Sequence, residues 1–366
     1  MGPFTEGVGT AIQRSRPLRL LAYGALYPVG VRFDYGGPPM KSVQVTAYGG
    51  PEVLRWVDVP DVLPEPDLLK VRVELASVNF ADTMARRGRY LASQPPFTTG
   101  IDFMGVVIDA PHEHEALLGR RVIGFGDGTM AEEISVDASM VAPIDDSIDP
   151  LVAAAAPLVL CTSLELIDRA GRLKPGERVA IYAASGGVGR TLIRLARAYG
   201  AGEIFALVGN SDKAQQSLEV GADHALIYRG PDAVDYSAEI LSKTDGHGVD
   251  LIFNSVAGTT FDSDFKMMAN FGRLVVFGIS SGDPGNAPSN LLHPTSRSVI
   301  GYSFSNLRRN RPYEVKPVLR RAVDQLEQGM EFEIAGVFPP VAADRAHQLL
   351  ESGESSGKIL IDFRNL

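Results

Sequence analysis

The sequence predicts a two-domain α/β protein, with a β-rich domain first and a doubly wound parallel sheet after it. Three observations predict this fold. The chain has 366 residues, enough for two hydrophobic cores. Short β-like stretches fill residues 40–136. Beyond Pro157, strand-like and helix-like segments alternate, as is typical of a parallel sheet covered by helices on both faces.

Residues 1–39 differ in composition from the rest of the chain. They carry four arginines against two acidic residues and end in Gly36-Gly37-Pro38-Pro39. We expect a disordered leader, or an upstream translation of a gene that begins at Met40. A targeting peptide is the alternative, but Pro28 and the lack of a clear small-residue cleavage site argue against it.

The β-rich domain is predicted between residues 40 and 160. Val71, Val73 and Leu75 alternate with polar residues, as in a strand with one solvated face. Glycine and proline clusters such as Gly49-Gly50-Pro51 separate this stretch from its neighbours. The predicted strands span residues 41–46, 54–59, 69–75, 105–108, 121–124 and 132–136.

The parallel sheet is predicted between residues 161 and 299. Its first strand, 178–183, is followed by apolar residues at helical spacing, and the helix predicted over 211–220 stops at Gly221. Further strands are predicted at 203–208, 225–228, 249–253 and 274–278. Helices at 315–328 and 342–350 and a strand at 358–363 close the chain.

Composition excludes several classes of protein. Charged residues are 22% of the chain and the net charge is −9, which argues against a general nucleic-acid surface. The densest basic run is Arg308, Arg309 and Arg311, which we interpret as a solvated helix start. No apolar run approaches the ~20 residues that a membrane-spanning helix needs; the longest, 151–161, contains Pro157.

The chain has a single cysteine, Cys161, so an intrachain disulfide and a cysteine-rich zinc site are excluded. Its neighbours Leu158 to Leu160 are apolar, which favours a packed thiol over a nucleophile. We expect a cytoplasmic protein.

A glycine-rich segment gives the sharpest functional signal. Ala184-Ser185-Gly186-Gly187-Val188-Gly189 is a variant of the G-x-G-x-x-G pattern with alanine at its first position. It follows a predicted strand and opens a predicted helix. Gly186 would let the backbone approach a pyrophosphate at the helix N-terminus, and Gly189 would let the helix pack against the strand. The segment predicts a dinucleotide cofactor.

The end of the second strand distinguishes NAD from NADP. An NAD site usually places an acidic residue there, to accept from the ribose 2′-hydroxyl. This chain has Val208-Gly209-Asn210-Ser211, and Asp212 comes late enough to cap or begin the next helix. Lys213 suits a dianionic 2′-phosphate. We therefore predict NADPH; the alternative for Lys213 is an ordinary exposed helix lysine.

Several further motifs occur in a characteristic order along the chain. They are Val78-Asn79-Phe80-Ala81-Asp82, Gly88-Arg89-Tyr90, residues 173–177, the glycine-rich segment, residues 220–224, Phe277-Gly278 and Gly357-Lys358. With these motifs, residues 40–366 resemble the medium-chain dehydrogenase/reductase superfamily, most of all its quinone oxidoreductase branch, which includes relatives of the vesicle amine transport protein. The resemblance implies a GroES-like domain at 40–160, a Rossmann domain at 161–299, a return to the first domain at 300–366, and a catalytic cleft between them.

The resemblance also implies the site residues. Asn79 would orient substrate or nicotinamide, Tyr90 would donate a hydrogen bond or proton, and Asp82 would hold local structure. As alternatives, Asn79 only caps a turn and Tyr90 only lines the pocket. The residues expected at the cofactor are Thr162, Ser185, Gly186, Gly187, Val188, Gly189, Asn210, Ser211, Lys213, Tyr228, Ser255, Phe277, Gly278 and Ile279.

Zinc chemistry is not expected. The zinc branch carries a Gly-His-Glu segment and an upstream catalytic cysteine, whereas this chain has Gly100-Ile101-Asp102 and no cysteine before Cys161. Hydrogen bonds must then activate the electrophile, which fits a quinone or an α,β-unsaturated carbonyl. A tyrosine common in quinone oxidoreductases is Met84 here, which makes the pocket more apolar.

Two alternative functions remain open. One is an enoyl-thioester reductase of acyl or polyketide metabolism, because residues 254–258 resemble that branch equally well. The other is a non-catalytic NADPH-binding scaffold. For either enzyme we expect a small-molecule substrate and no membrane span, and the habit of the family implies a homodimer.

Overall fold

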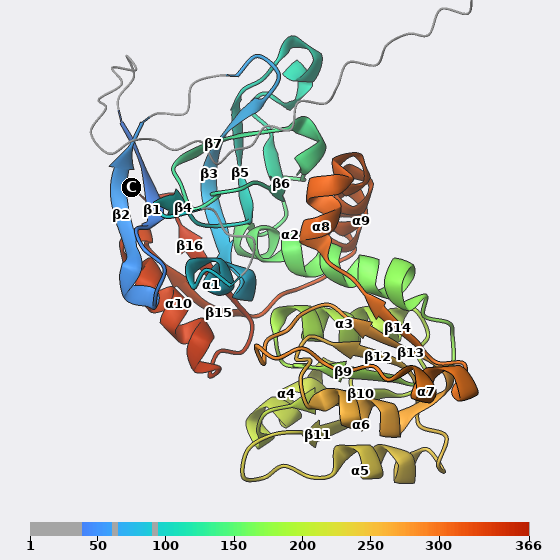
Figure 1. Cartoon of the computed structure of the whole chain (residues 1–366). Coiled ribbons are helices and arrows are strands. Elements are labelled where there is room, and N and C mark those ends of the chain that lie inside the picture. Colours follow the sequence, from blue (N-terminus) through green and yellow to red (C-terminus); the bar gives the residue numbers. More distant parts are fainter. Residues whose placement is uncertain (1–38, 61–64, 90–93, 366) are drawn as a thin grey trace, which may run out of the picture. The chain divides into compact units, whose positions relative to one another are not determined.

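The computed structural model describes residues 39–60, 65–89 and 94–365 (Figure 1). The leader and Tyr90 lie outside these residues, so the expectations for them are untested. The described chain contains two main sheets, one mostly antiparallel and one entirely parallel. This arrangement confirms the predicted fold class.

The antiparallel part is built mainly from the first third of the chain. A seven-stranded sheet has the order β15-β16-β3-β5-β6-β8, with β7 paired to β3, and a three-stranded sheet has the order β2-β1-β4. Chain-terminal strand β16 pairs antiparallel with β3, so the end of the sequence completes the first sheet. The strands are β1 (Met40–Val45), β2 (Leu54–Val59), β3 (Leu69–Val78), β4 (Phe97–Thr98), β5 (Asp102–Asp109), β6 (Arg121–Phe125), β7 (Glu133–Val136), β8 (Val141–Pro143), β15 (Ile334–Phe338) and β16 (Lys358–Asp362).

The parallel sheet has the order β11-β10-β9-β12-β13-β14, so the strand order reverses beside β9. In such sheets ligands bind beyond the carboxyl ends of the strands at this reversal. The strands are β9 (Val179–Tyr182), β10 (Ile204–Val208), β11 (His224–Ile227), β12 (Val249–Asn254), β13 (Met268–Val276) and β14 (Ser298–Gly301). Its helices include α3 (Gly187–Ala198), α4 (Ser211–Val220), α5 (Tyr236–Lys243), α6 (Thr260–Met267) and α7 (Ser289–Leu292).

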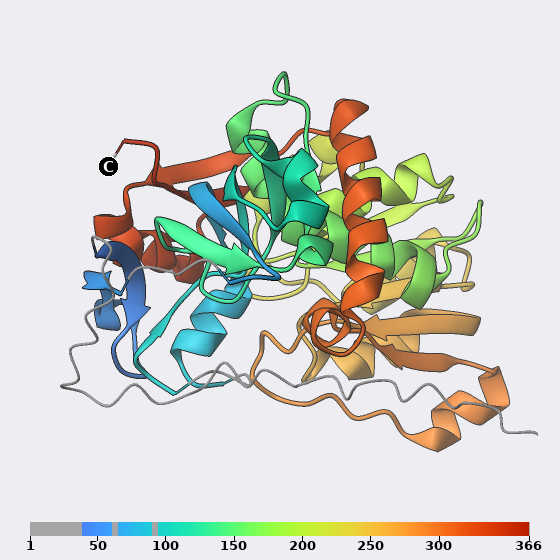
Figure 2. The ribbon, with the colours of Figure 1, turned by 90° about the horizontal axis from the view of Figure 1, so that it is seen from above.

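The remaining helices lie around the first sheet and beside the second. In both views α8 and α9 lie together next to α2, which they contact (Figures 1 and 2). They are α1 (Phe80–Arg86), α2 (Pro150–Glu165), α8 (Phe304–Asn310), α9 (Val315–Glu327) and α10 (Ala343–Ser352), with short 3-10 turns η1 (Pro51–Val53), η2 (His112–Leu117), η3 (Ala138–Met140), η5 (His293–Thr295), η6 (Pro312–Glu314) and η7 (Pro340–Ala342).

Helix α2 was not predicted from the sequence. It passes through Pro157 and continues as the π-helix η4 (Leu166–Gly171). Together they make a 22-residue helix long and apolar enough to cross a membrane by length and composition, which corrects the expectation that no such segment exists. Most of it is buried in the core, the usual position of a central helix in a globular domain.

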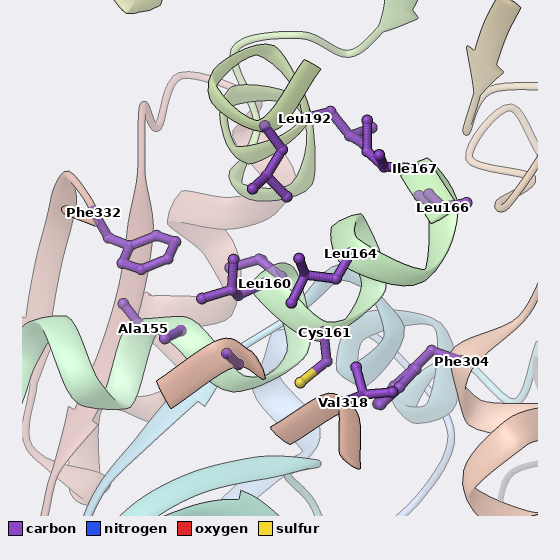
Figure 3. Packing of buried hydrophobic residues seen from close by; sticks show 14 of the residues in the cluster. Ala155, Leu160, Cys161, Leu164, Leu166, Ile167, Leu192, Phe304, Val318 and Phe332 are labelled. Atoms are coloured by element: carbon purple, nitrogen blue, oxygen red, sulfur yellow. The ribbon is translucent and has the colours of Figure 1, made fainter. Parts of the chain in front are cut away.

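The core around α2 contains the single cysteine of the chain. Cys161 is fully buried among apolar side chains that include Val318 and Phe304 (Figure 3). Burial raises the pKa of the Cys161 thiol well above its usual value, so the thiolate that a nucleophile needs is disfavoured. The prediction of a packed thiol is confirmed.

The interpretation of the arginine run is wrong for one of its members. Arg309 and Arg311 are exposed, but the side chain of Arg308 is only 10% exposed. Its guanidinium lies 5.2 Å from the centroid of the Phe125 ring and donates to the Gly126 carbonyl at 3.2 Å. The reason is helical spacing: Phe304, one turn earlier, also packs on Phe125 and turns that face of α8 inward.

Candidate active site

The glycine-rich segment forms the turn between β9 and α3. A Cβ at Gly189 would lie 2.4 Å from the Ala183 carbonyl oxygen and 2.6 Å from the Ala184 Cα, so only glycine fits. At Gly186, the residue before the helix, a Cβ would meet nothing closer than 3.3 Å. The turn thus brings bare backbone to a helix N-terminus, where N–H groups and the helix dipole favour a phosphate. These residues fit a dinucleotide pyrophosphate.

A second cluster lies at the ends of β10 and β11. The Asn210 side chain caps α4 by accepting from the Lys213 backbone N–H at 2.9 Å, and the Lys213 ammonium donates to the carbonyl of Gly353. Burial, and then the charge of Arg229, lowers the pKa of Lys213. The Arg229 guanidinium lies 5.6 Å from the centroid of the Tyr228 ring. The cations Lys213 and Arg229 and the phenol of Tyr228 therefore lie where a 2′-phosphate is expected to bind.

The expected nicotinamide loops pack on each other. The Ser255 carbonyl accepts from the backbone N–H of Ser280 at 3.0 Å, and a Cβ at Gly278 would lie 2.9 Å from the same oxygen. Ile279 is 43% exposed. The structure thus brings together Ser255 and the segment 277–279. Thr162 is nearly buried within α2.

Asn79 and Asp82, two of the three expected catalytic residues, belong to a buried polar network. Asn79 immediately precedes α1, and its Nδ2 donates to Asp102 Oδ1 at 2.7 Å, while its Oδ1 accepts from Lys358 Nζ at 2.6 Å. Ser77 Oγ donates to the same Asp102 oxygen at 2.6 Å. The second Asp102 oxygen accepts from the Leu158 backbone N–H at 3.0 Å. Both oxygens of Asp102 are thus engaged in hydrogen bonds.

Asp82 lies at the edge of this network. Its carboxylate accepts from the Asn79 backbone N–H at 2.8 Å, which ties the first turn of α1. Burial, helped by the charge of Asp102, raises the pKa of Asp82 to about 7, although the Asn79 hydrogen bond and Lys358 oppose the shift. Burial also lowers the pKa of Lys358, and Asp102 and Asp82 oppose that shift.

Lys358 links the network to the cofactor turn. A Cβ at Gly187 would lie 3.2 Å from Lys358 Cδ, so the lysine stem runs beside the glycine-rich segment. The ammonium has three donors, and Asn79 accepts one of them. Lys358 is therefore a candidate for holding the cofactor from the side of the first sheet.

Sequence reasoning missed the roles of Lys358, Asp102 and Arg229. Lys358 stood in a quoted motif and Asp102 at a position where the zinc branch has a ligand, but neither position alone indicates a hydrogen-bond partner. Arg229 directly follows Tyr228, so the sequence already placed it near the expected position of the 2′-phosphate. Among the residues that the structure describes, no cluster of histidine, cysteine or acidic side chains could hold a metal ion.

Two family models match the chain. The alcohol dehydrogenase GroES-like domain matches residues 65–146, and the zinc-binding dehydrogenase model matches residues 187–324. A mycobacterial protein solved in complex with NADPH is 30% identical, covers 88% of this chain and all of its own, and superimposes with a TM-score of 0.81.

Curated relatives fall into two groups. Quinone oxidoreductase-like protein 2 of Rattus norvegicus is 27% identical over 86% of this chain and 91% of its own length. A phenolphthiocerol/phthiocerol polyketide synthase component of Mycobacterium tuberculosis is 30% identical over 91% of this chain. This chain spans only 15% of that synthase component.

Fold and site together define a dinucleotide-binding protein with a GroES-like domain and a Rossmann domain. The chain belongs to the medium-chain dehydrogenase/reductase superfamily, in its zinc-free quinone oxidoreductase branch. The NADPH complex of the mycobacterial structure supports NADPH as the cofactor.

Proposed function

We propose that the protein is a zinc-independent, NADPH-dependent oxidoreductase that transfers hydride to a quinone or an α,β-unsaturated carbonyl. One observation carries the proposal. The backbone turn with Gly186 and Gly189 follows β9, Lys213 and Arg229 follow the neighbouring strands β10 and β11, and the buried network of Asn79 extends to the turn through Lys358. Bound NADPH supplies the hydride, and the residues of the chain orient it.

At the cofactor end, we propose that backbone N–H groups and cationic side chains bind different parts of NADPH. N–H groups at the start of α3 hold the pyrophosphate, and Lys358 adds a buried positive charge beside Gly187. Lys213 exchanges its Gly353 carbonyl for the 2′-phosphate, with Arg229 and Tyr228 as further donors. The proposed cofactor residues remain those expected from the sequence, with Arg229 and Lys358 added.

At the acceptor end, charge develops on the carbonyl oxygen as hydride adds to the conjugated carbon, so a positioned donor lowers the barrier. We propose Tyr90 as that donor. The side chain of Asn79 is held by Ser77, Asp102 and Lys358, and we propose that it orients the substrate or the nicotinamide. Asp82 is proposed to hold the first turn of α1.

NADPH consumption with a panel of acceptors tests the proposal. We expect turnover with 1,4-naphthoquinone or a simple enone, and none with acetaldehyde, which lacks the conjugated carbon. Loss of activity in a chelator would contradict zinc independence.

The enoyl-thioester alternative is favoured by one specific observation, the 30% identity to a polyketide synthase component over 91% of this chain. A preference for crotonyl thioesters over quinones in the same panel would establish it. NADPH binding without turnover of any acceptor would instead indicate the scaffold.

We further propose a cytoplasmic homodimer with domains at 40–160, 161–299 and 300–366. Among the described strands β14 pairs only with β13, so its outer edge can accept a strand from a second copy. Light scattering at micromolar concentration distinguishes dimer from monomer. Replacing Val299 by proline should shift the equilibrium between the two toward monomer.

A further inference from the structure

A buried arginine directly follows the glycine-rich turn. Arg190 comes after Gly189 in the first turn of α3, and its side chain is only 9% exposed. Its Nε donates to Glu333 Oε2 at 2.9 Å, and its Nη2 lies 2.6 Å from Glu333 Oε1, so two nitrogens hold one carboxylate. The third nitrogen, Nη1, donates to Ser356 Oγ at 3.1 Å. The guanidinium therefore joins the start of α3 to two segments near the end of the chain.

The two partners of Arg190 lie beside Lys358. Glu333 immediately precedes β15, and Ser356 lies just before β16, which begins at Lys358. The Lys358 backbone N–H donates to the Glu333 carbonyl at 2.7 Å. A Cβ at Gly357 would lie 2.3 Å from the same oxygen, so the two segments are in close contact at this point. Arg190 thus holds the backbone from which the Lys358 side chain extends.

The Lys358 side chain reaches both halves of the candidate site. Its stem runs beside Gly187, where a Cβ would lie 3.2 Å from Lys358 Cδ, and its ammonium donates to Asn79 Oδ1 at 2.6 Å. The residue is only 5% exposed. Because close-packed neighbours surround a buried side chain, a shift of the Lys358 backbone moves the ammonium with it.

We propose that Arg190 is a positioning residue that fixes the place of the Lys358 ammonium. It acts through Glu333 and Ser356, and every step is a hydrogen bond or a close backbone contact. This inference rests on the proposed NADPH site. An ammonium that is already in place needs no rearrangement when the cofactor binds. Lys358 lies at the pyrophosphate side of the site, which NADPH and NADH share, so the effect of Arg190 is the same for both nucleotides.

Arg190→Met removes the connection, and Arg194→Met is the matched control. Arg194 also binds the Glu333 carboxylate, at 2.8 Å, but its other hydrogen bond goes to the Glu331 carbonyl instead of Ser356. We expect Arg190→Met to raise the Kd of NADPH and of NADH about tenfold and to lower kcat with 1,4-naphthoquinone by a similar factor, whereas Arg194→Met should change each less than about threefold. Equal effects in the two variants, or a loss confined to NADPH, would overturn the proposal.

A milder pair of variants serves if Arg190→Met does not fold. Ser356→Ala removes one acceptor of Arg190 at a half-buried position, and Ser356→Thr keeps the hydroxyl. We expect Ser356→Ala to raise the Kd of both nucleotides about threefold, and Ser356→Thr to restore most of the affinity. Equal losses in the two variants, or no loss in either, would contradict a role for this hydrogen bond in positioning.

A double-mutant cycle tests whether the effect passes through Lys358. Lys358→Arg keeps a buried cation but changes its shape, and in this background Ser356→Ala should have no further effect on the Kd of either nucleotide. Additive effects would show that Ser356 does not act through Lys358. All Kd values are measured by nucleotide fluorescence without an acceptor, so a protein that turns over no acceptor would contradict only the proposed function.

Discussion

The two halves of the candidate site are built in opposite ways. At the cofactor half, the functional residues follow consecutive strands of a parallel sheet, as Gly186 follows β9 and Lys213 follows β10. At the catalytic half, Asn79 bonds to Lys358, which lies 279 residues away along the chain. The first half depends on local turns and the second on long-range pairing, so the two should respond differently to substitution.

The largest expected effect is at the catalytic half. Lys358→Met leaves Asn79 Oδ1 without its donor and Asp102 without a buried cation, and breaking a buried pair of this kind costs about 3–5 kcal/mol. We expect the free energy of unfolding, measured by urea denaturation, to fall by that amount. The exposed Lys174→Met is the control, with an effect within about 0.5 kcal/mol. A loss as small as the control's would show that the network does not depend on its cation.

At the cofactor half, Gly189→Ala should cost about 1–3 kcal/mol through overpacking, since its Cβ would meet Ala183 at 2.4 Å. Gly186→Ala is the matched comparison, because its Cβ would meet only the Ala183 carbonyl oxygen, at 3.3 Å, and would lie where we propose that the pyrophosphate binds. We expect it to keep the melting temperature and to weaken NADPH binding. If the two variants lose stability equally, the turn is packed differently from the structure described.

Cofactor preference gives the next effect in size. Lys213→Glu and Arg229→Glu should each raise the Michaelis constant for NADPH roughly ten- to a hundredfold, since a charged hydrogen bond contributes ~1.5–3 kcal/mol, and should leave NADH nearly unchanged. Lys243→Glu, at the exposed end of α5, is the control. Equal losses with both cofactors would mean that these cations do not read the phosphate.

The last expected effect is a pH dependence of stability, which is small for each pH unit and accumulates over the range. Burial gives Asp264 a native pKa of about 7 against 3.8 for the free side chain, so the native state holds a proton that the unfolded chain has released. The contribution of this proton to the stability of the native state is complete below the unfolded pKa and is lost as pH rises through the native pKa. Asp264→Asn stays neutral, so its stability relative to wild type should rise between pH 4.5 and 7 by at most roughly 1.4 kcal/mol per pH unit.

Thermal melts across this range measure the difference, and the exposed Asp212→Asn serves as control. A constant difference between Asp264→Asn and wild type would show that Asp264 is ionised throughout the range.

The sequence by itself determined the fold class and predicted the cofactor half of the candidate site. The predicted helix 211–220 coincides with α4, and the glycine pattern predicted the turn before α3, because turns and caps are set by neighbouring residues. The absence of an acidic residue near Val208, on which the NADPH prediction depends, could likewise be seen in the sequence. The family motifs predicted Asn79 and Asp82 as site residues but did not predict their hydrogen-bond partners.

Only the tertiary structure decided which distant groups meet. Helix α2 forms despite Pro157 because its alanine-rich surface is buried on several sides, and Arg308 turns inward because Phe304 packs on Phe125. Likewise, Lys358 reaches Asn79 because β16 pairs with β3. Pairing between distant strands and burial of a charge depend on the whole core, so no local pattern of residues specifies them.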